Sequence, residues 1–107
     1  EALAPDMRAL AALGHDAFIC TAPGTGHTSG ADVVSRVFVP GAGVDEDPVT
    51  GSAHAVLTAF WARRLGVEAF RAFQASARGG HVACRIDGER VWLGGGCVTV
   101  VEGQFRL

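Results

Sequence analysis

One stretch of the chain gathers the residue types that acid–base chemistry needs, in the order Asp45-Glu46-Asp47-Pro48-Val49-Thr50-Gly51-Ser52-Ala53-His54. It leads into an apolar run that predicts a helix over 51–65, so its last residues form the first helical turn. Unpaired N–H groups and the helix dipole make such a turn a site for a carboxylate or phosphate. Gly51 has no Cβ, so a ligand can approach the backbone closely. The Ser52 hydroxyl adds a donor, and Asp47 could orient a polar group or relay a proton.

The start of this helix can be placed in two registers. In the first, Thr50 is the N-cap, and its hydroxyl accepts the amide proton of Ser52 or Ala53. In the second, Asp47 is the cap and Pro48 takes the first helical position. Both registers bring the amides of residues 51–53 to the positive end of the helix. From these residues alone, a capped helix after a solvated acidic loop, with no ligand, also explains the pattern.

Composition narrows the class of protein. The chain has 107 residues, about one domain, and its 49% hydrophobic content excludes general disorder. No apolar run approaches the ~20 residues of a membrane span. Nine Lys and Arg face eleven Asp and Glu, a net charge of −2 that excludes the basic surface of a nucleic-acid binder. The apolar content is generous for so small a core, which favours an apolar surface that faces a second domain or subunit.

Histidines and cysteines give no sign of a metal or a disulfide. The four His have no HxH or HExxH spacing, so we expect no metal, and nothing indicates a cofactor. The three Cys at 20, 84 and 97 are odd in number, lack a CxxC motif and lie in apolar, strand-like runs. We therefore expect reduced, buried thiols in a cytoplasmic protein.

The remaining elements must position the 45–54 stretch. We expect a short helix over 5–13 and a glycine-rich loop over 23–30. The strands expected from apolar alternation and turn residues are 16–22, 32–39, 71–76, 81–86, 90–93, 97–101 and 104–107. The pair Asp87-Gly88 predicts a hairpin. The 51–65 helix is apolar almost all round, which is typical of a buried helix. The predicted fold class is therefore α+β: a mostly antiparallel, rolled sheet around one central buried helix.

The 46–54 stretch resembles the signature of the phenazine-biosynthesis F-like (PhzF-like) family, which shares the diaminopimelate epimerase fold. Supporting blocks follow in the family's order: Ser35–Pro40 before the motif, Phe60–Gly66 at the helix end, Gln74–Gly80 at the following strand and turn, and Val91–Leu107 at the terminal strands. Members of this family have two similar lobes with an active site in the cleft between them. The whole chain, 1–107, resembles the second, C-terminal lobe as a single domain.

The resemblance implies a function and a set of site residues. The expected activity is a cofactor-independent isomerisation that moves a proton on a small carboxylate-bearing substrate. Asp47 and Ser52 match the catalytic positions of the second lobe, and Thr50, Gly51, Ser52, Ala53 and His54 are the expected substrate-binding residues, although a structural role is favoured for His54. The family's essential Glu and its Gly-His segment belong to the first lobe and have no counterpart here. We therefore expect that a missing N-terminal lobe completes the site, that this lobe alone is inactive, and that the protein is a homodimer.

A second class of function also fits the sequence. The chain could be a non-catalytic lobe that binds a small carboxylate, or a dimerisation module that uses the apolar surface left by the absent lobe. The pattern does not favour a Ser-His-Asp hydrolase, because Ser52 and His54 lie about 200° apart around the helix.

Overall fold

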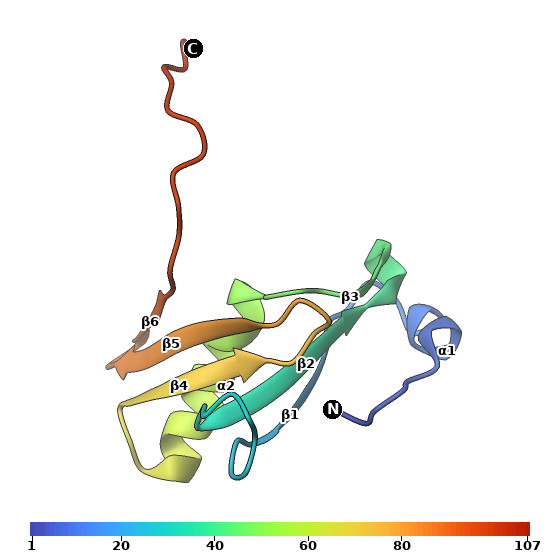
Figure 1. Ribbon diagram of the computed structural model, residues 1–107. Coiled ribbons are helices and arrows are strands. Elements are labelled where there is room, and N and C mark those ends of the chain that lie inside the picture. The colour runs from blue at the N-terminus through green and yellow to red at the C-terminus, as the bar shows by residue number, and fades with distance from the viewer.

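The computed structural model describes residues 1–107 as one mixed sheet with a long helix against it (Figure 1). The elements are α1 (Met7–Ala11), β1 (Phe18–Pro23), β2 (Val33–Val39), the 3-10 turn η1 (Pro40–Ala42), β3 (Val44–Glu46), α2 (Gly51–Leu65), β4 (Ala69–Gln74), β5 (Gly80–Asp87) and β6 (Arg90–Gly94). The sheet has the strand order β1-β2-β4-β5-β6, and β3 pairs with β2. The predicted α+β class with a mostly antiparallel sheet is confirmed.

The crossover through α2 explains the one parallel pairing. β2 and β4 lie parallel because β3 and α2 intervene between them, whereas every other strand pair is antiparallel. The predicted hairpin is present between β5 and β6, where Asp87 pairs with Arg90 and the two-residue turn is Gly88-Glu89. This topology brings the end of β4 beside the segment that enters α2.

Helix α2 has the predicted bounds, and its C-terminal end carries a clear signal. It ends at Gly66, whose φ of +66° is the left-handed conformation that glycine adopts readily. One face of the helix packs on the sheet and forms a core of Val33, Leu57, Trp61, Ala62, Phe70, Ala72, Val82 and Cys84. Trp61 also donates its indole N–H to Thr21 Oγ1 at 2.9 Å, which ties α2 to β1.

The expectation that α2 is buried on all sides is wrong for this chain. Val56 and Phe60, on the face turned away from the sheet, are 63% and 46% exposed. Apolar composition around a helix indicates that every face has a partner, but it does not say whether the partner belongs to the same chain. Here the sheet covers one side only.

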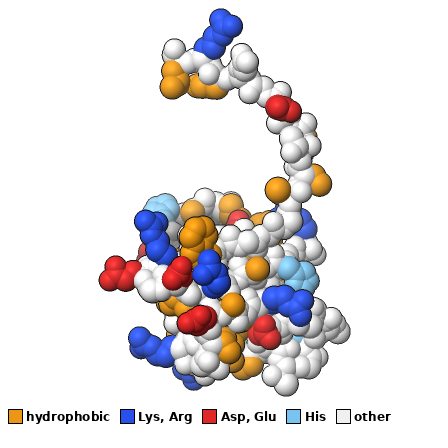
Figure 2. Space-filling model, turned by 90° about the vertical axis from the view of Figure 1, so that its left-hand side faces the viewer, with side chains coloured by type: hydrophobic (Ala, Val, Ile, Leu, Met, Phe, Trp, Pro, Cys, Tyr) orange, Lys and Arg blue, Asp and Glu red, His pale blue; other side chains and the backbone are white.

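The predicted strands 97–101 and 104–107 are absent. Residues 95–107 carry no regular structure and extend away from the body, as Figures 1 and 2 show. Val98 is 84% exposed and Phe105 is 88% exposed. Alternating β-branched residues favour an extended chain, but a strand also needs a neighbour for its N–H and C=O groups, and residues 95–107 have none.

Other boundaries and two of the thiols also differ from expectation. The strand expected at 71–76 lies two residues earlier as β4, and the acidic segment before α2 contains the short strand β3, which the sequence did not indicate. Cys84 is buried as expected, but Cys20 is partly buried and Cys97 is exposed on the extended segment. All three cysteines are free thiols.

Candidate active site at the start of helix α2

The first turn of α2 carries three backbone N–H groups with no partner in the chain, those of Gly51, Ser52 and Ala53. The first amide that bonds within the helix is that of His54, which donates to the Thr50 carbonyl at 3.2 Å. Gly51 and Ser52 are exposed, and a Cβ placed on Gly51 would meet no atom within 4 Å. The amides of Gly51 and Ser52 are therefore open to a ligand at the positive end of a 15-residue helix, whereas Ala53 is buried and its N–H is unpartnered.

Neither predicted side-chain cap forms. Thr50 is the N-cap residue and has the extended backbone of one, but its hydroxyl accepts no helical amide. The hydroxyl instead donates to Oδ2 of Asp47. The alternative register, with Asp47 as cap and Pro48 in the helix, is wrong as well, because α2 begins at Gly51.

Asp47 lies beside the helix start and is partly buried. Its N–H donates to the Val37 carbonyl at 2.9 Å, which anchors the residue to β2. Within the chain, its Oδ1 atom makes no hydrogen bond, so one carboxylate oxygen stays available next to the helix amides. The structure thus brings together Asp47, Thr50, Gly51, Ser52 and the Ala53 amide.

His54 differs from the other predicted residues because its ring is completely buried, at 0% exposure. Its Nδ1 lies 2.7 Å from the Thr50 carbonyl, so Nδ1 carries the proton that this carbonyl accepts. Its Nε2 atom has no hydrogen-bond partner. In this geometry His54 holds the first helical turn together, and its ring contacts a ligand at the helix start only after a rearrangement.

A cleft of about 580 Å³ adjoins the helix start, and Gly51 forms part of its wall. The other lining residues are Val49, Arg78, Gly79, Gly80, His81, Val82, Leu93, Gly94, Gly95 and Gly96. Arg78 is exposed and forms no ion pair or hydrogen bond, so its positive charge is free to attract an anion. Arg78 and His81 were missed in the sequence reasoning, which used the Gln74–Gly80 block only as a strand and turn.

Glu46 has a structural partner. Its carboxylate accepts two hydrogen bonds from Arg36, from Nε at 2.8 Å and from Nη2 at 2.9 Å. Hydrogen bonding to this guanidinium lowers the pKa of Glu46 and raises the pKa of Arg36. The pair joins β2 to β3, and Glu46 is therefore an ionised strand residue rather than a proton donor at neutral pH.

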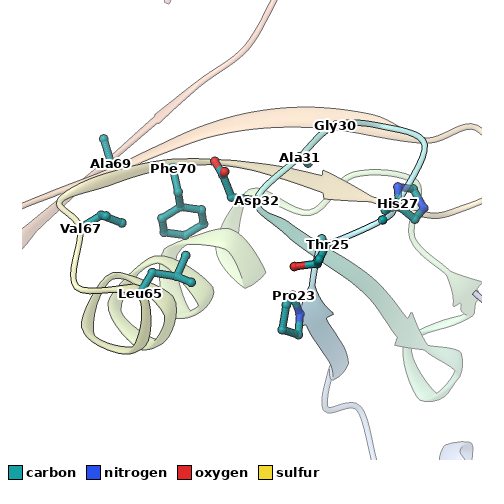
Figure 3. Close-up of a pocket in the computed structure, with 12 residues that line it drawn as sticks. Pro23, Thr25, His27, Gly30, Ala31, Asp32, Leu65, Val67, Ala69 and Phe70 are labelled. Atoms are coloured by element: carbon teal, nitrogen blue, oxygen red, sulfur yellow. The ribbon is translucent and has the colours of Figure 1, made fainter.

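A second cavity, of about 460 Å³, lies at the opposite end of α2 (Figure 3). Its walls come from the 23–32 segment on one side and from Leu65, Val67, Ala69 and Phe70 on the other, and it contains none of the predicted site residues. The C-terminal end of a helix and the carboxylate of Asp32 both disfavour a negative ligand there. Gly24 shapes this loop, because a Cβ on it would lie 1.9 Å from the Ala31 carbonyl oxygen.

No three His, Cys, Asp or Glu side chains lie together in a group that could hold a metal ion. None of the helices has both the length and the apolar character that crossing a membrane requires.

Comparison with known sequences decides the family. A family profile described as phenazine biosynthesis-like protein matches residues 1–103. The chain belongs to the phenazine biosynthesis-like family. It is 50% identical over 107 residues to an uncharacterized isomerase of Pseudomonas aeruginosa, and 52% identical over 82 residues to a human phenazine biosynthesis-like domain-containing protein.

Solved structures of the phenazine biosynthesis-like family share the fold. A putative phenazine biosynthesis PhzC/PhzF protein of Clostridium difficile matches 99% of this chain with a TM-score of 0.80 at 34% identity. A PhzF-family protein of Enterococcus faecalis matches 86% of the chain with a TM-score of 0.76 at 43% identity. The chain covers 40% of the Pseudomonas and Clostridium proteins and 28% of the human protein. It therefore spans less than half of the length of these relatives.

Proposed function

We propose that this chain supplies the second half of the active site of a cofactor-independent isomerase. One observation carries the proposal: three unpartnered amides, an exposed hydroxyl and a carboxylate lie together at the start of α2, in a family that includes proteins named isomerases. The substrate class is a small carboxylate-bearing molecule, because backbone N–H groups at a helix N-terminus favour a negative group.

The proposed roles follow from the chemistry of each group. The N–H groups of Gly51, Ser52 and Ala53 and the Ser52 hydroxyl hold the substrate carboxylate, and Arg78 adds positive charge at the edge of the cleft. Asp47 orients a polar group of the substrate, or relays a proton, through its free Oδ1 atom. The acid or base that takes the proton from carbon comes from a first lobe, because Glu46 is committed to Arg36.

To test this proposal, the chain is expressed joined to the further residues that its longer relatives carry. The joined protein is then incubated in D₂O with a set of small cyclic and amino-acid-like carboxylates. Proton relocation should incorporate solvent deuterium into one of them, which mass spectrometry detects without knowledge of the product. Asp47→Asn and Ser52→Ala should each lower that rate by about tenfold or more while the protein stays folded. Unchanged rates in both variants would contradict the assignment of these residues.

The exposed apolar surface supports a second candidate, a lobe that binds a small carboxylate or mediates dimerisation without catalysis. Val56 and Phe60 on α2 and the extended 95–107 segment leave apolar side chains in water. Such surfaces are typical of interfaces with another domain or subunit. Carboxylate binding with no deuterium incorporation would favour this candidate, and a homodimer in the cytoplasm is compatible with either one.

A further inference from the structure

The side chain of Gln74, the last residue of β4, lies wholly buried beneath the segment that enters α2, at 0% exposure. Its amide makes three hydrogen bonds, all to that segment. Oε1 accepts from the Thr50 N–H at 2.8 Å, and Nε2 donates to the Asp47 carbonyl at 2.7 Å and to Thr50 Oγ1 at 3.1 Å. One side chain thus fixes both ends of the turn between Asp47 and Thr50.

These bonds also set the direction of the Thr50 hydroxyl. The Gln74 N–H occupies one acceptor position of Oγ1, and the hydroxyl hydrogen points to Oδ2 of Asp47. A Thr at the N-cap ordinarily accepts the N–H of the second or third helical residue. Thr50 makes no such bond, so the Ser52 and Ala53 amides stay uncapped.

We propose that Gln74 is a positioning residue that commits the Thr50 hydroxyl to Asp47 and so keeps the first amides of α2 available to the substrate carboxylate. This inference rests on the proposed function. The position requires a group that both donates and accepts, and the neutral amide of glutamine does both. Methionine has a similar length and does neither, and an ionised glutamate can only accept.

A purely structural role for Gln74 makes a different prediction. Loss of a buried hydrogen-bonding group destabilises a protein in either case. If Gln74 also directs the hydroxyl, its removal releases Thr50 to cap the helix, and the Ser52 and Ala53 amides become protected. If Gln74 only satisfies the backbone, its removal loosens the turn and those amides gain no protection.

The first test compares the ¹⁵N-labelled 107-residue chain with its Gln74→Met variant, and uses benzoate as the carboxylate and benzamide as the uncharged control. In Gln74→Met, hydrogen exchange at Ser52 and Ala53 should slow by about tenfold, and benzoate affinity, read from amide shifts at residues 51–53, should fall by about tenfold. Gln104→Met, in the exposed terminal segment, should change neither quantity. Unchanged or faster exchange at Ser52 and Ala53 overturns the inference, whatever happens to affinity.

The second test uses Gln74→Glu and remains available if the methionine variant fails to fold. A protonated carboxyl has one acceptor and one donor, one donor fewer than the amide, and burial raises the pKa of a carboxyl at such a position. Benzoate affinity should therefore be closer to that of the wild type near pH 5.5 than near pH 8, where it should be about tenfold weaker than in the wild type. At pH 8 the Ser52 amide of the variant should also exchange more slowly than the Ser52 amide of the wild type measured at the same pH. A pH profile identical to that of the wild type overturns the inference.

The two proposals fail in different ways. If benzoate shifts no amide at residues 51–53 of the wild type, the carboxylate site under the proposed function is wrong. The exchange rates measured without benzoate still decide whether Gln74 directs the Thr50 hydroxyl.

Discussion

The hydroxyl of Thr50 donates its hydrogen to the carboxylate of Asp47, and α2 therefore begins without a side-chain cap. A capping Thr typically stabilises a protein by about 1 kcal/mol, so this arrangement gives up a stabilising contact at the start of the longest helix. The same contact fixes the Asp47 carboxylate beside the free amides. A capped first turn and unpartnered first-turn amides exclude each other here, and the chain has the unpartnered amides.

Substitution of Gly51 tests directly whether a carboxylate binds to the exposed amides at the start of α2. A Cβ atom at residue 51 meets no protein atom within 4 Å, and the backbone there is helical, so Gly51→Val should leave the unfolding free energy within about 0.5 kcal/mol of the wild type. The added methyl groups lie where a carboxylate approaches the amides, so benzoate affinity should fall by about tenfold or more. Calorimetry and an NMR titration measure the two quantities. Unaltered affinity would place the ligand elsewhere.

Gly80 and Val49 lie in close contact, so the effects of substitutions at these two positions on stability should be strongly coupled. A Cβ on Gly80 would lie 2.1 Å from Cγ2 of Val49, so Gly80→Ala should destabilise the fold by about 1–3 kcal/mol and move the segment that enters α2. Adding Val49→Ala should recover part of that loss, since it removes the obstructing methyl. Denaturant unfolding of the single and double variants gives the coupling energy. Gly96→Ala is the matched control, because its Cβ meets nothing.

The Arg36–Glu46 pair predicts a specific acid sensitivity. Hydrogen bonding to Arg36 lowers the pKa of Glu46 in the folded protein from its ordinary value of 4.5. The stability from this shift is fully present above that value and is lost as the pH falls through the lower, folded pKa. Glu46→Gln should cost about 1 kcal/mol at pH 7 and should weaken the decline of stability at acid pH.

Unfolding curves between pH 7 and about pH 3 test this dependence. Asp45→Asn is the control, because Asp45 is exposed and makes no ion pair. An identical acid decline in Glu46→Gln and the wild type would show that the pair has no energetic role.

The uncovered face of α2 predicts self-association of the isolated chain. Val56 and Phe60 are exposed, so replacing both with Gln should cost about 1 kcal/mol or less, chiefly through the lost contact of Phe60 with Trp61 and Arg64. The same double variant should shift sedimentation velocity profiles from dimer to monomer. A wild type that already sediments as a monomer would exclude association through this face.

Local signals in the sequence were sufficient for the main elements. The apolar run gives α2 and Gly66 marks its C-terminal end, and alternation with turn residues gives the β5–β6 hairpin. The family motif also led to the cluster of Asp47, Thr50, Gly51 and Ser52, which the fold brings together. Each of these depends on residues close together in the chain.

Contacts between distant residues explain what was missed. Gln74 bonds to Thr50 and Asp47 from 24 and 27 positions away, and nothing in its own neighbourhood indicates a polar contact. Alternation over 97–101 predicts an extended chain, but a strand also requires a partner, and the pattern carries no information on where that partner lies. The exposed side of α2 has the same origin, because burial of a helix depends on contacts with distant residues, and none covers Val56 and Phe60.

Cys97 has a practical consequence. Cys97 is the one exposed cysteine, and it follows Gly96 at the edge of the cleft. Burial raises the pKa of the Cys84 thiol, which keeps that sulfur protonated and slow to alkylate. A maleimide or nitroxide reagent should therefore modify Cys97 first. A paramagnetic label attached there would report the distance to any small acid that docks against the glycines of the cleft.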